Sequence, residues 1–283
     1  MNPGTAMLPE IVLPGLGWTL RSYTAMLALA VALSLWIGPR WAQMLEGIDP
    51  RATRRVLLAL AAAAFAGGRL HVVANYWQHY AAHPAAIAEF WAGLHAGGAI
   101  VAIVLALPLV VRGTGVPAAK FADALVPTFG LGIAVARTGC YLQGCCFGTP
   151  CALPWCVSFP PGSDSYVLQV STGLLAPDAA HAAPVHPLEL YFATAGVLIT
   201  IVGIWLHRRK AYDGEVALVA LLLFSASSAW LETFRGAIPQ RVWWGPLPEL
   251  EWVALAMTVL SFAVLLAAER IHRRRPWAER MAA

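Results

Sequence analysis

An arginine followed by a glycine-rich segment is the part of this sequence best suited to chemistry. Arg137 follows an apolar run, residues 121–136, and precedes Gly139, Gly144 and Gly148. A charged residue at the end of such a run is costly to place in a membrane, and it points to a functional site with an anionic partner. Glycines let the backbone turn and approach a ligand closely. The segment predicts contact with a phospholipid headgroup. The structural alternative is a helix end whose arginine extends to the membrane surface.

Composition indicates the kind of element that must position this segment. The chain is 59% hydrophobic and 12% charged, and its mean hydropathy is +0.65, which excludes a soluble globular protein. We predict an all-α polytopic membrane protein, organised as a single domain over residues 1–283. About seven stretches approach the roughly 20 residues that a transmembrane helix needs. They are residues 20–37, 56–77, 86–111, 121–136, 188–207, 216–234 and 252–268.

The basic residues predict an orientation. Fourteen of the nineteen Lys and Arg residues lie between spans one and two, three and four, or five and six, or after span seven. The positive-inside rule makes that side cytoplasmic, so the N-terminus is expected outside and the C-terminus inside. Residues 1–18 contain no Lys or Arg, so they lack the charged start of a cleaved signal peptide.

Five arginines lie on the opposite side, where topology disfavours them: Arg21, Arg69, Arg137, Arg235 and Arg241. A phosphate group explains them most simply, because guanidinium groups match phosphate oxygens in a bidentate manner. The alternative is that some of them pair with Glu189, Glu232 or Glu251.

The longest loop, residues 149–185, contains no Lys or Arg and is expected to form a small extracytoplasmic cap between the fourth and fifth helices. Weak alternation predicts two short strands in it, at residues 154–159 and 166–170.

All five cysteines lie in or just before this loop: Cys140, Cys145, Cys146, Cys151 and Cys156. Their spacing is not that of a zinc ribbon. Structural packing or one disulfide is favoured over metal binding, and metal binding over a catalytic thiol.

Read together, several motifs resemble those of the bacterial prolipoprotein diacylglyceryl transferases, a seven-span family, over nearly the whole chain. The segment from Arg137 to Gly148 resembles the family signature, with cysteines in the form that many members carry. Four further motifs occur in the family's order: Arg21-Ser-Tyr23, Gly68-Arg69-Leu70, His186-Pro-Leu-Glu-Leu-Tyr191 and Glu232-Thr-Phe-Arg235.

The resemblance implies a reaction in the bacterial cytoplasmic (inner) membrane. Diacylglyceryl would pass from phosphatidylglycerol to the lipobox cysteine of a prolipoprotein signal peptide, with release of glycerol 1-phosphate. It implies catalytic roles for His95, Arg137 and Tyr23. It also implies a substrate-binding set: Arg69, Gly97, Gly98, Cys140, Gln143, Gly144, Gly148, His186, Glu232 and Arg235. No metal, soluble cofactor or nucleic acid is implied.

The chain departs from the family pattern at three positions. Ala96 stands where the family has His or Tyr before Gly97-Gly98, and His95 lies one place earlier. One residue turns a helical side chain by about 100°. Ser228 and Phe224 replace an arginine and a tyrosine of span six. Two interpretations remain open. One is a working transferase in which His95 is the base, and the other is a paralogue that binds phospholipid or lipoprotein, or uses another acceptor.

Overall fold

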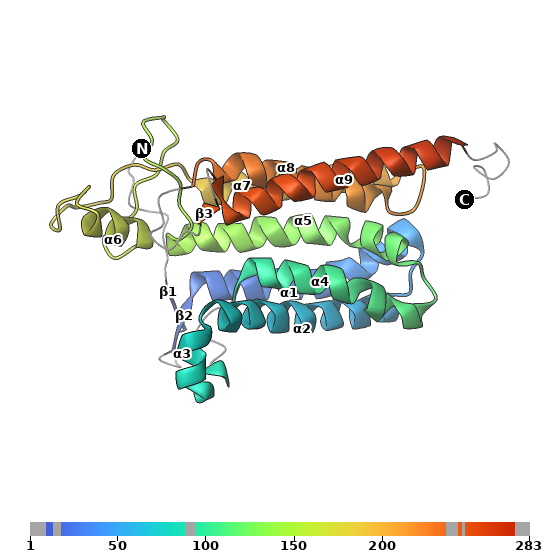
Figure 1. Ribbon diagram of the computed structural model, residues 1–283, viewed down its shortest axis with the longest axis horizontal. Coiled ribbons are helices and arrows are strands. Elements are labelled where there is room, and N and C mark those ends of the chain that lie inside the picture. Colours follow the sequence, from blue (N-terminus) through green and yellow to red (C-terminus); the bar gives the residue numbers. More distant parts are fainter. Residues whose placement is uncertain (1–9, 14–17, 89–93, 236–242, 245–246, 275–283) are drawn as a thin grey trace. The chain divides into compact units, whose positions relative to one another are not determined.

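The computed structural model describes residues 10–13, 18–88, 94–235, 243–244 and 247–274. Within these residues, seven helices are long and apolar enough to cross a bilayer, which confirms the predicted all-α membrane architecture (Figure 1). They are α1 (Ser22–Glu46), α2 (Pro50–Asn75), α4 (Ala96–Val111), α5 (Ala118–Gln143), α7 (Leu188–His207), α8 (Glu215–Glu232) and α9 (Glu249–Arg274).

The third span begins later than expected. Apolar composition placed its start at residue 86, but α4 starts at Ala96, whose preceding residue His95 is the N-cap. Between α2 and α4 the described residues include a short helix, α3 (Trp77–Ala82), and a 3₁₀ segment, η1 (Pro84–Ala88). The η1 segment contains three alanines and an isoleucine, which are apolar like the residues of a span, so hydropathy alone did not find the break.

Contacts group the chain into two compact units, Ser34–Leu125 and Met1–Leu33 with Val126–Ala283. The organisation of the chain as one domain stays a prediction. In the first unit, α2 and α4 lie side by side (Figure 1). Gly67 and Gly98 face each other there, and a Cβ on Gly98 would collide with the carbonyl of Gly67. Small residues allow this backbone contact, which drives helix association in membranes.

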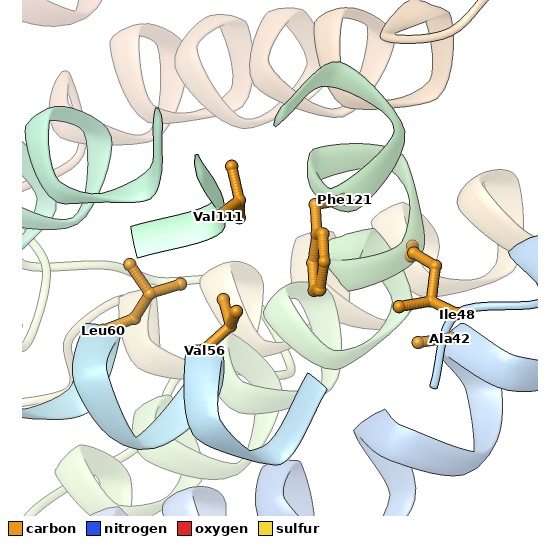
Figure 2. Packing of buried hydrophobic residues seen from close by; sticks show 7 residues of the cluster. Ala42, Ile48, Val56, Leu60, Val111 and Phe121 are labelled. Carbon is orange, nitrogen blue, oxygen red and sulfur yellow. The ribbon is translucent and has the colours of Figure 1, made fainter. Parts of the chain in front are cut away.

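A cluster of apolar side chains forms the core of this unit at the other end of the helices. Val56 and Leu60 of α2 meet Val111 and Phe121, and Ile48 closes the side next to α1 (Figure 2). Phe121 is fully buried. Asp49 caps α2 by accepting a hydrogen bond from the amide of Ala52 at 2.9 Å.

In the second unit, α7, α8 and α9 pack in sequence order (Figure 1), and the residues of α5 from Val126 onward pack against α7 and α8. Gly130 and Gly196 repeat the glycine contact: a Cβ on Gly196 would lie 2.6 Å from the carbonyl oxygen of Gly130. Thr200 donates a hydrogen bond at 3.2 Å to the carbonyl of Pro127, which is the proline inside α5.

The loop between α5 and α7 has its own small core of Phe147, Phe159, Ala182 and Val185. The strand predicted at residues 166–170 is wrong, because these residues lie in α6 (Asp164–Ser171). Ser163 caps this helix by accepting from the amide of Tyr166 at 3.2 Å, a local signal that outweighs the weak alternation.

The other strand predicted in this loop, at residues 154–159, is also wrong. This segment makes only an isolated bridge, in which the amides and carbonyls of Val157 and Val185 pair at 3.0 Å. Cys151 and Cys156 form a disulfide, as one of the favoured interpretations expected.

Two short antiparallel pairs were not predicted. β1 (Glu10–Leu13) pairs with β2 (Trp18–Arg21), and β3 (Trp243–Trp244) pairs with β4 (Leu247–Pro248). Arg21 therefore ends a strand, opposite Glu10 in register, and α1 begins at the next residue.

Candidate functional site at the end of α5

Arg137 lies in the last two turns of α5, inside the helix rather than at its end. Its guanidinium carbon lies 4.3 Å from the ring centroid of Phe192 on α7, a cation–π contact. Among the described residues it makes no hydrogen bond or ion pair. Its charge and its five N–H donors are thus available to an anionic ligand.

Tyr23 and Gln143 lie together in the same unit. The amide of Tyr23 donates to the side-chain oxygen of Gln143 at 3.3 Å, so the first turn of α1 is joined to the last residue of α5. Gly139 makes this approach possible, because a Cβ there would lie 2.7 Å from Cβ of Met26. The glycine predicted to approach a ligand therefore approaches α1.

After α5 the chain turns back on the helix. Gly144 has φ +75°, and Cys146 has φ +65°, the only positive φ of a non-glycine residue in the part of the chain described. The amide of Cys145 donates to the carbonyl of Cys140 at 3.1 Å. Cys140, Cys145 and Cys146 are brought together by this turn, with their Sγ atoms within 4.8 Å of one another.

The cysteine cluster is electrostatically asymmetric. Hydrogen bonds from the Cys140 and Cys145 thiols lower the pKa of the Cys146 thiol, against the effect of burial, and the charges of Arg137 and Arg235 lower it further. The pKa of Cys145 is raised, first by its hydrogen bond to Cys140 and then by that to Cys146. The thiols and the two arginines therefore favour negative charge on Cys146 over Cys145.

Arg235 and Glu232 form a buried bidentate ion pair. The Nε and Nη2 atoms of Arg235 each donate to a carboxylate oxygen of Glu232 at 2.7 Å, and Nη1 donates to the carbonyl of Cys146 at 3.4 Å. Pairing with glutamate was the alternative to phosphate binding for these arginines, and Arg235 forms such a pair. Arg241, another of the five arginines, lies outside the described residues.

His186 and Gly148 connect the loop to α7 and α8. The Nδ1 atom of His186 lies 3.1 Å from the hydroxyl of Tyr191, which also accepts from the indole of Trp155 at 2.9 Å. Gly148 donates its amide to the His186 carbonyl at 2.9 Å, and a Cβ there would lie 2.8 Å from the Phe234 carbonyl oxygen. The need for glycine at 148 thus comes from chain packing.

Glu189 is a residue that sequence reasoning named only as an arginine partner. It is fully buried in the first turn of α7, and neither carboxylate oxygen has a hydrogen-bond partner within the described chain. Phe192 lies three positions after Glu189, so both side chains lie on one face of the helix. A buried carboxyl without partners is unusual enough to need an explanation. The signal that could have found it is its place inside the motif His186-Pro-Leu-Glu-Leu-Tyr191.

The remaining predicted residues belong to the other unit. Arg69 is buried and donates to the carbonyls of Ile87 at 3.2 Å and Ala86 at 2.6 Å, and its guanidinium lies 5.1 Å from the Tyr80 ring centroid. These contacts hold η1 against α2. Whether Arg69 also binds substrate stays a prediction.

His95 caps α4. Its Nδ1 accepts a hydrogen bond from the amide of Gly97 at 3.2 Å, and its ring stacks on His71 with centroids 4.0 Å apart. A neutral imidazole whose Nδ1 accepts carries its proton on Nε2, so the one basic nitrogen of this tautomer is engaged in the helix cap. Gly97 and Gly98 are explained by the cap and by the contact with Gly67. The catalytic role of His95 stays a prediction.

The structure thus brings Tyr23, Arg137, Gln143, the cysteine cluster and Arg235 into one neighbourhood of one unit, and places Arg69, His95, Gly97 and Gly98 in the other. Phe224, one of the three departures, packs edge-on against Phe129 with centroids 5.5 Å apart. Its ring is part of the packing between α5 and α8.

Known proteins resemble this chain over most of its length. The family described as prolipoprotein diacylglyceryl transferase matches residues 11–267. Relatives named phosphatidylglycerol–prolipoprotein diacylglyceryl transferase include that of Synechococcus elongatus, 30% identical over 77% of this chain and 73% of its own length. Those of Thermosynechococcus vestitus (27%, covering 86% of each chain) and Leifsonia xyli subsp. xyli (28%, covering 93% of this chain and 79% of the relative) are also similar. This chain belongs to the prolipoprotein diacylglyceryl transferase family.

Proposed function

We propose that this protein transfers a diacylglyceryl group from phosphatidylglycerol to the cysteine thiol of a prolipoprotein. The observation that supports this most is the guanidinium of Arg137. It has no carboxylate or carbonyl partner among the described residues, in a chain whose family match covers residues 11–267.

The proposed reaction is a substitution at the glycerol carbon that carries the phosphodiester. The acceptor thiol loses its proton, its sulfur forms the C–S bond, and the C–O bond to phosphate breaks, which releases glycerol 1-phosphate. A cation placed at the phosphate stabilises the charge that develops on the leaving group. It also favours the acceptor thiolate, because a free cysteine has a pKa of about 8.5.

We assign the phosphate to Arg137 and a positioning role to Arg235. The charge of Arg235 is matched by Glu232, and its guanidinium holds the carbonyl of Cys146. Both arginines lie over the ring of Phe192, at 4.3 and 5.9 Å from its centroid. In this proposal Tyr23, Gln143 and Gly144 shape the headgroup site beside Arg137, and a prolipoprotein signal peptide supplies the thiol.

The orientation belongs to the proposal as well. With fourteen of nineteen basic residues on one side, we propose an external N-terminus, a cytoplasmic C-terminus and an external loop between α5 and α7 in the bacterial inner membrane. Reporter fusions after Lys210 should behave as cytoplasmic, and a fusion at Gly173 as external. A cytoplasmic signal at Gly173 would reverse the assignment.

The second candidate is a paralogue that binds phosphatidylglycerol without transfer. The engagement of His95 in the α4 cap and the packing of Phe224 favour it, since neither residue supplies the proton acceptor or hydroxyl of the family pattern.

Purified protein in phosphatidylglycerol vesicles, given a lipobox peptide, separates the two candidates. Formation of a diacylglyceryl thioether, detected by mass spectrometry, supports transfer. Bound phosphatidylglycerol with no thioether favours the paralogue, and absence of both contradicts the proposal. An Arg137→Lys variant is the matched control, because it keeps the charge and loses the bidentate donor geometry.

A further inference from the structure

Three cysteines without a disulfide partner gather at the end of α5. Cys140 is buried, Cys145 and Cys146 are half-buried, and all three Sγ atoms lie within 4.8 Å of one another. The other two cysteines of the chain, Cys151 and Cys156, are bonded to each other. The three thiols therefore form a set of their own.

The backbone places these thiols together. Gly144 ends α5 in the left-handed region, the amide of Cys145 bonds to the Cys140 carbonyl, and Cys146 adopts φ +65°. A non-glycine residue in that region is strained, so the surrounding structure must hold it there. The turn returns Cys145 and Cys146 to the last turn of the helix, where Cys140 lies.

We propose that Cys140, Cys145 and Cys146 form a binding site for a thiophilic ion of the zinc class. A tetrahedral zinc ion with Zn–S bonds of about 2.3 Å holds its sulfur ligands roughly 3.8 Å apart. The 4.8 Å limit on the Sγ separations meets that requirement with shifts of about 1 Å or less. Three protein ligands leave the fourth position of the ion open, as in catalytic zinc sites.

Two features of the surroundings support the site, one acting on the ligands and one on the ion. Cysteines bind zinc as thiolates, so a neighbourhood that stabilises negative sulfur favours binding. Arg235 lies beside Cys146, because its Nη1 donates to the Cys146 carbonyl at 3.4 Å, and a nearby arginine stabilises a thiolate. The C-terminal end of α5 carries the negative pole of the helix dipole, which favours a cation beside Cys140.

The test measures ion binding by the full-length protein in detergent, so it does not depend on the proposed transfer. We expect about one zinc ion per chain by elemental analysis after zinc loading and desalting. Co²⁺ in its place should give the thiolate charge-transfer absorption of a cysteine-bound ion. Cys140→Ser, Cys145→Ser and Cys146→Ser should each weaken zinc binding by at least about 10- to 100-fold.

A double variant, Cys151→Ala with Cys156→Ala, is the matched control, because it removes two cysteines and leaves the site intact. It should keep the zinc content and the cobalt spectrum. Gel filtration of each variant checks that it remains folded. Zinc content that survives all three serine substitutions, no zinc binding by the wild type, or a disulfide between two of the three cysteines in peptide mass spectra would each overturn the proposal.

Discussion

The end of α5 and the region around the start of α4 both carry a buried or half-buried arginine beside glycines, yet the arginines are engaged differently. Arg137 lies over the face of Phe192 and makes no hydrogen bond or ion pair among the described residues, whereas Arg69 donates to the carbonyls of Ala86 and Ile87. A charge in an apolar helix marks a functional site by default. The hydrogen-bond partners of such an arginine must therefore be known before a ligand is assigned to it. Arg69 binds backbone carbonyls of its own chain, whereas the N–H donors of Arg137 can bind a ligand.

Breaking the ion pair between Arg235 and Glu232, in the site at the end of α5, should give the largest effect. Glu232→Gln leaves the Arg235 charge buried without its partner, so we expect a loss of about 3–5 kcal/mol in the free energy of unfolding. Thermal unfolding in detergent measures it, with Asp178→Asn on the exposed loop as control. A stability equal to that of the wild type would mean that Arg235 does not need this carboxylate.

Arg137→Lys should act on activity instead. Lysine keeps the charge but loses the planar fork, and we expect a fall in transfer of about 10²–10³-fold with little change in stability. The exposed Arg208→Lys is the control. Transfer by the lysine variant at the wild-type rate would show that the fork of Arg137 has no role.

Arg69→Lys should instead lower stability more than it lowers transfer. A single ammonium does not reach both carbonyls in the same geometry, so the free energy of unfolding should fall by about 1–3 kcal/mol. The rate per folded molecule should change less than in Arg137→Lys. Arg54→Lys at an exposed position of α2 is the control. A large loss of rate at full stability would place Arg69 with substrate.

His95→Asn should have the smallest effect. Asparagine is as good an N-cap as any residue and accepts no proton at neutral pH, so a purely capping His95 is replaced at a cost of no more than about 0.5 kcal/mol. If His95 is the base, the same variant loses about 10²–10⁴-fold in transfer. Activity and unfolding measured on one preparation therefore separate the two roles.

Much of the fold could be predicted, because a span of about 20 apolar residues has few alternatives in a membrane protein. The later start of α4 and the helix at α6 could not, because apolar content does not report local breaks, and five alternating residues are compatible with either strand or helix. Motif order pointed to Arg137, Tyr23 and Arg235. It did not separate a paired guanidinium from an unpaired one. Glu232, three positions before Arg235, was already a possible partner in the sequence, whereas Phe192 comes beside Arg137 only in the fold.

The two glycine contacts, Gly67 with Gly98 and Gly130 with Gly196, bear on how this protein is engineered. Where backbone meets backbone, no side chain remains to be trimmed in compensation for an added methyl group. Replacing glycine by alanine inside helices stabilises many soluble proteins. At these positions the added methyl group would push the two helices apart. A thermostable variant of this chain is better sought on its lipid-facing and loop positions, with these four glycines left untouched.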